Sequence, residues 1–207
     1  MRKKLLLSSR LYVIIDKNIS GKKSVKDLAR KIKGADIVQL RDKISDRESA
    51  LRNAYLLQKS FSNTQTIFII NDYLDIAKIA ECDGLHIGQD DIPIEIARKV
   101  LGKEKIIGVS CHNLKQALEA QRRGADYIGF GPIFPSPAKP GSKAIGLGLI
   151  KKLRKKLKIP FFAIGDVNLN NIDRVKCAGA NRVAVCRAAL KAKNISLAVK
   201  GFNKILA

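Results

Sequence analysis

The chain has 207 residues, of which 46% are hydrophobic, so it can bury a sizeable core and is not a disordered chain. It carries 40 Lys and Arg against 18 Asp and Glu, a formal net charge of +22. Such an excess is typical of general lysine enrichment, of a field that attracts small anionic substrates, or of nucleic-acid binding. The basic residues are scattered through predicted helices with no interleaved aromatic stripe, so we expect no nucleic-acid partner.

Eight short apolar segments are predicted as strands, at residues 11–15, 36–40, 67–70, 85–87, 105–109, 126–130, 160–164 and 182–185. Helices are predicted between them, at 25–32, from the Asp46 cap to 61, between the third and fourth strands, and then at 93–101, 113–124, 147–157 and 168–178, where Asn168 is the expected cap. A last helix is predicted from the eighth strand to the C-terminus. Residues 131–143 form a loop that contains four of the six prolines.

This alternation of strands and helices predicts an α/β fold. Eight units favour a single (β/α)8 TIM barrel over residues 1–207, since about 200 residues is the lower end for that fold. An open doubly wound sheet is the alternative. No apolar run is long enough for a transmembrane helix, so no membrane partner is expected.

Acids follow two neighbouring predicted strands. Asn71 and Asp72 end one strand, and Asp91 follows the next. Because the carboxyl ends of parallel strands open on one face, these carboxylates are expected to face each other. Hard oxygen ligands of this kind suit Mg²⁺, which usually takes one or two carboxylates and phosphate oxygens. Asp90 is an alternative ligand, and helix capping is an alternative role for these acids.

Basic and polar side chains end the other strands. Gln39, Arg41 and Lys43 alternate along the second strand and are expected on one side, where they could clamp a diphosphate. Ser110 and His112 end the fifth strand, and in the proline-rich loop Ser136 and Lys139 could reach an anion over the barrel mouth. Gly165 follows the seventh strand, near where barrels commonly bind phosphate. A solvated strand end and a plain surface loop are the alternatives.

Together these residues resemble the thiamine phosphate synthase family. Its motifs are matched over Leu11 to about Leu190 by Gln39-Leu-Arg-Asp-Lys43, Asn71-Asp72, His86-Ile-Gly-Gln-Asp-Asp91, Gly108-Val-Ser110 and Gly124-Ala-Asp-Tyr-Ile-Gly-Phe-Gly-Pro-Ile-Phe-Pro135. The resemblance implies a (β/α)8 barrel. It also implies a transferase that joins 4-amino-5-hydroxymethyl-2-methylpyrimidine diphosphate to a thiazole phosphate, with release of diphosphate.

The resemblance also implies the roles of individual residues. Gln39, Arg41, Lys43, Asn71 and Lys139 would bind the diphosphate, Asp72 and Asp91 would hold Mg²⁺, Ser110 would contact the pyrimidine, and Ser136 matches a Thr of the substrate loop. Arg41, Ser110 and Lys139 are the groups expected to act in catalysis. A departing diphosphate needs cations more than it needs a base, which agrees with these residue types.

Three positions depart from the family pattern, and one of them is Ala138, which replaces a loop hydroxyl. Asp166 stands where a glycine amide would approach the thiazole phosphate, and Arg187 stands where a small hydroxyl residue is usual. A carboxylate ~5 Å from a phosphate charge costs about 3 kcal/mol at an effective dielectric of about 20. Our hypothesis is that Arg187 pairs with Asp166 or takes over phosphate binding.

Other functions stay open at this point. A thiazole tautomerase or a paralogue with an altered substrate would share the barrel, and a barrel that binds a thiamine precursor without turnover is a non-enzyme alternative. The four cysteines, Cys82, Cys111, Cys177 and Cys186, have no metal-type spacing and no disulfide framework. The N-terminal apolar run is too short for a signal peptide. We therefore expect a cytoplasmic enzyme with small phosphorylated substrates, and a homo-oligomer is left open.

Overall fold

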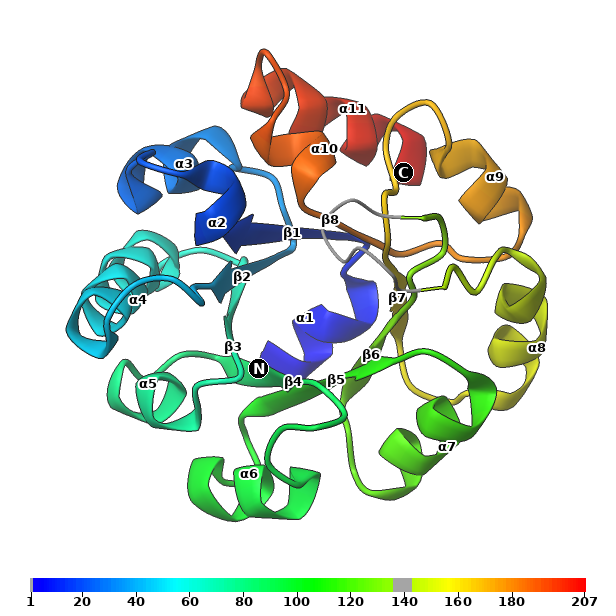
Figure 1. Cartoon of the computed structure of the whole chain (residues 1–207), viewed down its shortest axis with the longest axis horizontal. Helices are drawn as coiled ribbons and strands as arrows, with labels where there is room; N and C mark the ends of the chain where they lie inside the picture. Colours follow the sequence, from blue (N-terminus) through cyan, green and yellow to red (C-terminus); the bar gives the residue numbers. More distant parts are fainter. Residues whose placement is uncertain (1, 136–142) are drawn as a thin grey trace.

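The computed structural model describes residues 2–135 and 143–207, which form one closed barrel of eight parallel strands in sequence order (Figure 1). The last strand pairs with the first, as Leu11 does with Val183. The strands are β1 Leu11–Asp16, β2 Ile37–Arg41, β3 Ile67–Asn71, β4 Gly84–Ile87, β5 Ile106–Cys111, β6 Tyr127–Phe130, β7 Phe161–Ala163 and β8 Val183–Val185. The predicted TIM barrel is confirmed, and the open sheet is excluded because the sheet has no edge.

The helices are α1 Arg2–Ser8, α2 Lys17–Ser20, α3 Val25–Lys31, α4 Arg47–Phe61, α5 Leu74–Ile79, α6 Ile94–Leu101, α7 Leu114–Arg122, α8 Gly148–Lys156, α9 Ile172–Cys177, α10 Arg187–Leu190 and α11 Ile195–Leu206. Most of them form a ring around the barrel (Figure 1). None of those in the described ranges combines the length and apolar character that crossing a bilayer requires.

Some predicted helix boundaries are confirmed and others are wrong. Asp46 caps α4 as predicted, since its carboxylate accepts a hydrogen bond from the Ser49 N–H at 2.7 Å. Asn168 does not cap α9, because its side chain accepts from the Asn170 N–H in a preceding turn and the helix begins only at Ile172. The predicted C-terminal helix is split into α10 and α11, and Asn194 caps the second of them.

The buried side chains form two layers. The larger layer lies between the strands and the surrounding helices, where the hydrophobic contact is continuous. The smaller one fills the barrel interior with alternate residues of the strands, including the rings of Tyr12, Tyr127 and Phe162. These rings lie with centroids 5.4–5.8 Å apart, in tilted or edge-to-face contact. The interior is therefore a packed core and not a pore.

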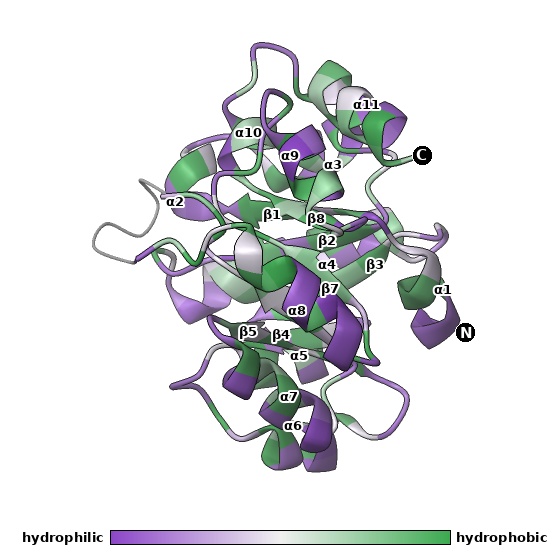
Figure 2. Cartoon of the chain, turned by 90° about the vertical axis from the view of Figure 1, so that its right-hand side faces the viewer, coloured by the Kyte–Doolittle hydropathy of each residue, from purple (hydrophilic) through white to green (hydrophobic). Residues whose placement is uncertain are grey.

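Helix α1 lies across one end of the barrel, opposite the end where α2 lies (Figure 2). Its Leu6 is buried against the interior layer. Arg2 and Lys3 pair with Asp83 and Asp126, which precede β4 and β6. This helix was not predicted, and it leaves the carboxyl ends of the strands as the open end.

Candidate active site

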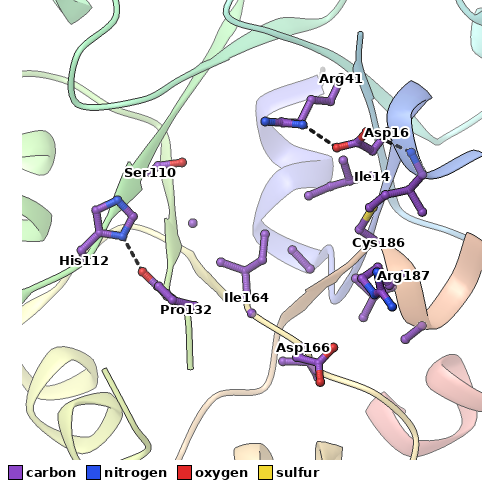
Figure 3. A pocket seen from close by; sticks show the side chains of 18 residues that line it. Ile14, Asp16, Arg41, Ser110, His112, Pro132, Ile164, Asp166, Cys186 and Arg187 are labelled. Carbon is purple, nitrogen blue, oxygen red and sulfur yellow. Dashed lines mark hydrogen bonds and ion pairs between the residues drawn. The ribbon is translucent and has the colours of Figure 1, made fainter. Parts of the chain in front are cut away.

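Polar side chains gather at the carboxyl ends of the strands, around an open cavity. Its lining includes Asp16 and Arg41 on one side and Ser110 and His112 on the other, with Asp166 and Arg187 at its rim (Figure 3). The floor between them is apolar and includes Ile14 and Ile164. A cavity with an apolar floor and a few convergent polar groups is the usual form of a small-molecule site.

Asp72 and Asp91 lie against each other at the ends of β3 and β4. Their carboxyl groups are within hydrogen-bonding range. Asp72 Oδ2 is also 2.7 Å from Lys43 Nζ, and Asp91 Oδ2 accepts the Gly88 N–H at 2.6 Å. Burial and the adjacent Asp91 raise the pKa of Asp72, against the lowering effect of Lys43. Partial burial acts to raise the pKa of Asp91 as well, but the Gly88 N–H and the bond from Asp72 lower it overall.

The backbone at Asp72 is unusual. Its φ is +62°, a conformation rare outside glycine, and its N–H donates to the His86 carbonyl at 2.8 Å. Helices α5 and α6 are capped at Tyr73 and Pro93 without a side-chain bond, so neither carboxylate serves as a helix cap. The alternative of helix capping is therefore wrong for both acids.

The donor set fits Mg²⁺. Within the described residues there is no group of three or more His, Cys, Asp or Glu side chains that could hold a metal ion. Mg²⁺ does not need one, because it takes one or two carboxylates and fills its other positions with water and phosphate oxygens. Two carboxylates in contact repel each other when both are ionised, and a divalent cation between them removes that repulsion. Asp91, and not Asp90, is the acid that meets Asp72.

Arg41, the last residue of β2, and Lys43, two residues later, also lie at the carboxyl end of the barrel. Arg41 Nη1 is 2.5 Å from Asp16 Oδ2, and Asp16 also accepts from the backbone N–H groups of Asn18 and Ile19, which caps α2. Lys43 is half-exposed beside Asp72. Asn71 is the last residue of β3 and is partly exposed. Each cation is held by one carboxylate, so an anionic ligand would meet guanidinium and ammonium groups that are already in place.

Gln39 lies one layer below these groups. Its side chain is buried, and its Nε2 donates to Tyr12 Oη at 2.6 Å. The alternation predicted for Gln39 and Arg41 places both inside the barrel, but only Arg41 and Lys43 reach the mouth. Ser110 lines the cavity, and its Oγ is 2.9 Å from His86 Nε2.

Gly165 and Asp166, which follow β7, and Arg187, which follows β8, lie at the rim of the cavity. Gly165 has φ +107°, and an added Cβ there would lie 2.4 Å from Pro132 Cα, so only glycine fits. The Asp166 carbonyl accepts from the side-chain amides of Asn168 and Asn171. Asp166 and Arg187 are both exposed, and the ion pair we hypothesised between them is not formed in the described part of the chain.

Ser136 and Lys139 lie outside the described residues. Two other groups of the site were not predicted from the sequence: Asp16, which follows the same rule of an acid at the end of a strand, and the buried phenols Tyr12 and Tyr127. His112 also lines the cavity, with its Nδ1 2.5 Å from the Gly131 carbonyl oxygen. Cys111 is buried, which raises the pKa of its thiol to about 12, as expected for a packing residue.

The sequence profile described as thiamine monophosphate synthase matches residues 11–189, from the first strand to α10. The chain belongs to this family. Two curated thiamine-phosphate synthases are similar to it. The one from Methanocella arvoryzae is 40% identical over 199 residues (95% of this chain and 94% of the relative), and the one from Halalkalibacterium halodurans is 37% identical over 200 residues (95% of each).

A solved structure of this family has the same fold. The thiamine phosphate pyrophosphorylase from Pyrococcus furiosus superimposes with a TM-score of 0.86 at 32% identity, over 99% of this chain and 96% of that one. A 3-hexulose-6-phosphate synthase reaches 0.70 at 20% identity, which is a likeness of fold alone.

Proposed function

We propose that this chain is a thiamine phosphate synthase. It joins 4-amino-5-hydroxymethyl-2-methylpyrimidine diphosphate to a thiazole phosphate and releases diphosphate. The observation that carries the proposal is the contact between Asp72 and Asp91 beside Lys43, at the open end of a barrel that belongs to this family. We take residues 1–207 as one barrel domain in the cytoplasm, where its four cysteines stay free thiols.

The reaction needs charge stabilisation at one point. The bond between the pyrimidine methylene carbon and the diphosphate oxygen breaks, and the electron pair leaves with the diphosphate. The thiazole nitrogen then donates its lone pair to the carbocation-like methylene, which gives thiamine phosphate. No proton has to be removed before this step, so the residues must bind, orient and neutralise charge.

Residues of β2 and β3 supply this environment. Arg41 and Lys43 receive the leaving diphosphate, Asn71 donates an amide N–H to it, and Lys139 is proposed as a further cation for it. Asp72 and Asp91 would hold Mg²⁺, which when bound neutralises negative charge on the diphosphate. The ion pair with Asp16 keeps the Arg41 guanidinium in a fixed position before the substrate binds.

The other half of the cavity takes the two rings. Ser110 contacts the pyrimidine, and the apolar floor formed by Ile14 and Ile164 covers the aromatic faces. The thiazole phosphate binds at the rim, where Gly165 allows close approach of the backbone, and Ser136 is proposed as a further group that binds this substrate. Arg187 supplies a cation for the thiazole phosphate, since its guanidinium is exposed at the same rim.

The function is tested by incubating the purified protein with both substrates and Mg²⁺ and measuring the thiamine phosphate that forms. The Arg187→Ala variant is expected to raise the KM for the thiazole phosphate about 10-fold, with the KM for the pyrimidine diphosphate unchanged. An active enzyme in which this variant leaves thiazole phosphate affinity unchanged would contradict the role of Arg187.

A thiazole tautomerase is the second candidate, favoured only by His112, which lines the cavity. A tautomerase needs no metal and would keep its activity in EDTA, whereas the synthase would lose it. A barrel that binds without turnover would release no diphosphate in a coupled assay.

A further inference from the structure

Five polar side chains from five different strands form one hydrogen-bonded chain across the barrel interior. It runs from Gln39 through Tyr12, Tyr127 and His86 to Ser110. Gln39 Nε2 to Tyr12 Oη is 2.6 Å, and Tyr12 Oη to Tyr127 Oη is 2.9 Å. Tyr127 Oη to His86 Nδ1 is 3.0 Å, and His86 Nε2 to Ser110 Oγ is 2.9 Å. Gln39, Tyr12, Tyr127 and His86 are buried, and only Ser110 reaches the cavity.

The first link fixes the direction of the chain. The amide Nε2 of Gln39 can only donate, so Tyr12 Oη accepts from it. Burial raises the pKa of both phenols, so each keeps its own proton at neutral pH. Among the described residues, the remaining partner of the Tyr12 hydroxyl is Tyr127 Oη, so Tyr12 donates to Tyr127. The opposite direction would give Tyr12 two donors and leave its own buried proton without an acceptor.

The last two hydrogen bonds, from Tyr127 to His86 and from His86 to Ser110, lead to the cavity. Tyr127 has accepted from Tyr12, so its hydroxyl donates to His86 Nδ1. Because Nδ1 accepts from Tyr127, the ring proton lies on Nε2, which then donates to Ser110 Oγ. The Gln89 side chain also holds the Ser110 carbonyl, at 2.6 Å. Since His86 occupies a lone pair of Ser110 Oγ, the Ser110 proton points to whatever acceptor the cavity holds.

Two glycines and an aromatic ring pack closely around these hydrogen-bonded side chains. A Cβ added at Gly108 would lie 2.0 Å from Tyr127 Cζ, so a side chain at this position would displace the phenol. The Gly129 backbone lies under His86, where an added Cβ would be 3.4 Å from Cε1. The rings of Tyr12 and Tyr127 also pack edge-on against Phe162. The rings that carry the hydroxyl groups are therefore in close contact with the core on several sides.

We propose that Tyr12, Tyr127 and His86 are positioning residues that make Ser110 a hydrogen-bond donor to a ring nitrogen of the pyrimidine substrate. The inference rests on the proposed function for the identity of the ligand, but the direction of the chain is a property of the protein alone. It accounts for two buried phenols among the apolar side chains of the interior layer. It also gives Gln39 a part in substrate recognition from a buried position.

The direction can be measured without substrate. The protein has only two histidines, and the structure assigns them opposite tautomers. His86 carries its proton on Nε2, and His112 carries its proton on Nδ1, which faces a carbonyl oxygen. Long-range ¹H–¹⁵N spectra of the labelled full-length protein distinguish the two forms, and a His112→Gln variant assigns the signals. We expect one histidine of each tautomer. An Nδ1–H form at His86 would overturn the proposal, because it means that the chain runs the other way.

The consequence for binding can be measured by calorimetry with two probes, the pyrimidine diphosphate and inorganic diphosphate, both with Mg²⁺. Tyr127→Phe keeps the ring but removes the donor to His86. It is expected to weaken binding of the pyrimidine diphosphate about 5-fold, the value of one hydrogen bond, and to leave inorganic diphosphate unchanged. Tyr55→Phe, at an exposed tyrosine of α4, is the matched control and should change neither. A Tyr127→Phe variant that weakens both probes equally, or neither, would contradict the proposal.

A double-mutant cycle separates positioning from a general loss of structure. Ser110→Ala removes the last donor, so adding Tyr127→Phe to it should cost little further affinity for the pyrimidine diphosphate. Fully additive losses would overturn the coupling. If the wild type binds neither probe, the proposed function fails while the tautomer result still decides the direction of the chain. If Tyr127→Phe does not fold, the ¹H–¹⁵N spectrum of the wild-type histidines remains the test.

Discussion

The two ends of the barrel treat their acidic residues in opposite ways. At the amino end, Asp36, Asp83 and Asp126 precede β2, β4 and β6. Each accepts a backbone N–H at the start of the preceding strand, from Leu11, Phe68 and Ile107 at 2.8–2.9 Å. Asp83 also pairs with Arg2, and Asp126 pairs with Lys3 and Arg98. These carboxylates tie neighbouring strands to each other and to α1.

At the carboxyl end, Asp72 and Asp91 meet each other, beside the half-exposed Lys43. The acids of the closed end are matched with donors. At the open end Asp16 is also matched, with Arg41 and two backbone N–H groups, whereas Asp72 and Asp91 lie acid against acid beside Lys43. The acids of the amino end therefore stabilise the fold, whereas the Asp72–Asp91 pair leaves negative charge available for a bound cation. Acids that the protein itself satisfies hold the fold, and acids that need an external cation mark the site.

The largest expected effect is on activity. Asp72→Asn keeps the size of the side chain and removes the charge, so the synthase activity should fall about 100-fold or more, as for loss of one preorganised charge-stabilising group. Asp90→Asn is the control. Asp90 is exposed and has no ion pair or side-chain hydrogen bond in the described part of the chain, and we expect near wild-type kcat/KM. If kcat/KM fell strongly in Asp90→Asn and little in Asp91→Asn, Asp90 and not Asp91 would be the metal ligand.

The next effect is on stability at the closed end. Asp126→Ala removes the carboxylate that pairs with Arg98 and the acceptor of the Ile107 N–H, which should cost about 3 kcal/mol of unfolding free energy. At roughly 2–4 °C per kcal/mol, Tm should fall by about 6–12 °C. Activity at low temperature should persist, because the site lies at the other end. Asp173→Ala, an exposed acid on α9, should change Tm far less. If both variants melt alike, the ties between strands do not carry stability.

A smaller effect concerns Mg²⁺ and pH. The folded-state pKa of Asp72 is raised, so without metal its contribution to stability is present below the ordinary pKa and is lost as pH rises through the raised value. Mg²⁺ reverses this, because it needs both carboxylates ionised. At about ten times its Kd, Mg²⁺ should raise Tm by about 3–6 °C near pH 7, from roughly 1.4 kcal/mol of binding linkage. The rise should vanish toward acidic pH, and thermal scans of Asp72→Asn should show no Mg²⁺ dependence at any pH.

The smallest effect is expected on the outer helices. Glu48 and Arg52 form an i,i+4 ion pair on α4 with side chains 82% and 67% exposed. Pairs this exposed contribute little, so Glu48→Gln should shift Tm by less than about 1 °C, with or without added salt. A shift as large as that of Asp126→Ala would mean that exposure does not separate the two kinds of acid.

The elements of the fold follow from local pattern. Eight apolar segments at regular spacing, with caps such as Asp46, predicted the strands and most helices because burial on both faces requires continuous apolar runs. Helix α1 and the late start of α9 were not predictable in this way. The first forms because Leu6 and Arg2 find partners at the barrel end, far along the chain. The second is set by a local turn that competes with the helix for Asn168.

The order of residues along the chain places acids and bases at the ends of consecutive strands. Because all parallel strands point the same way, this was enough to predict Asp72, Asp91, Arg41, Lys43 and Ser110 at one mouth. Which of these groups touch depends on the three-dimensional fold. Closure of the barrel brings Tyr12 to Tyr127, 115 residues away in the chain, and sets Asp16 against Arg41. Contacts of this kind depend on register and on the curvature of the whole sheet, and no local pattern of residues encodes them.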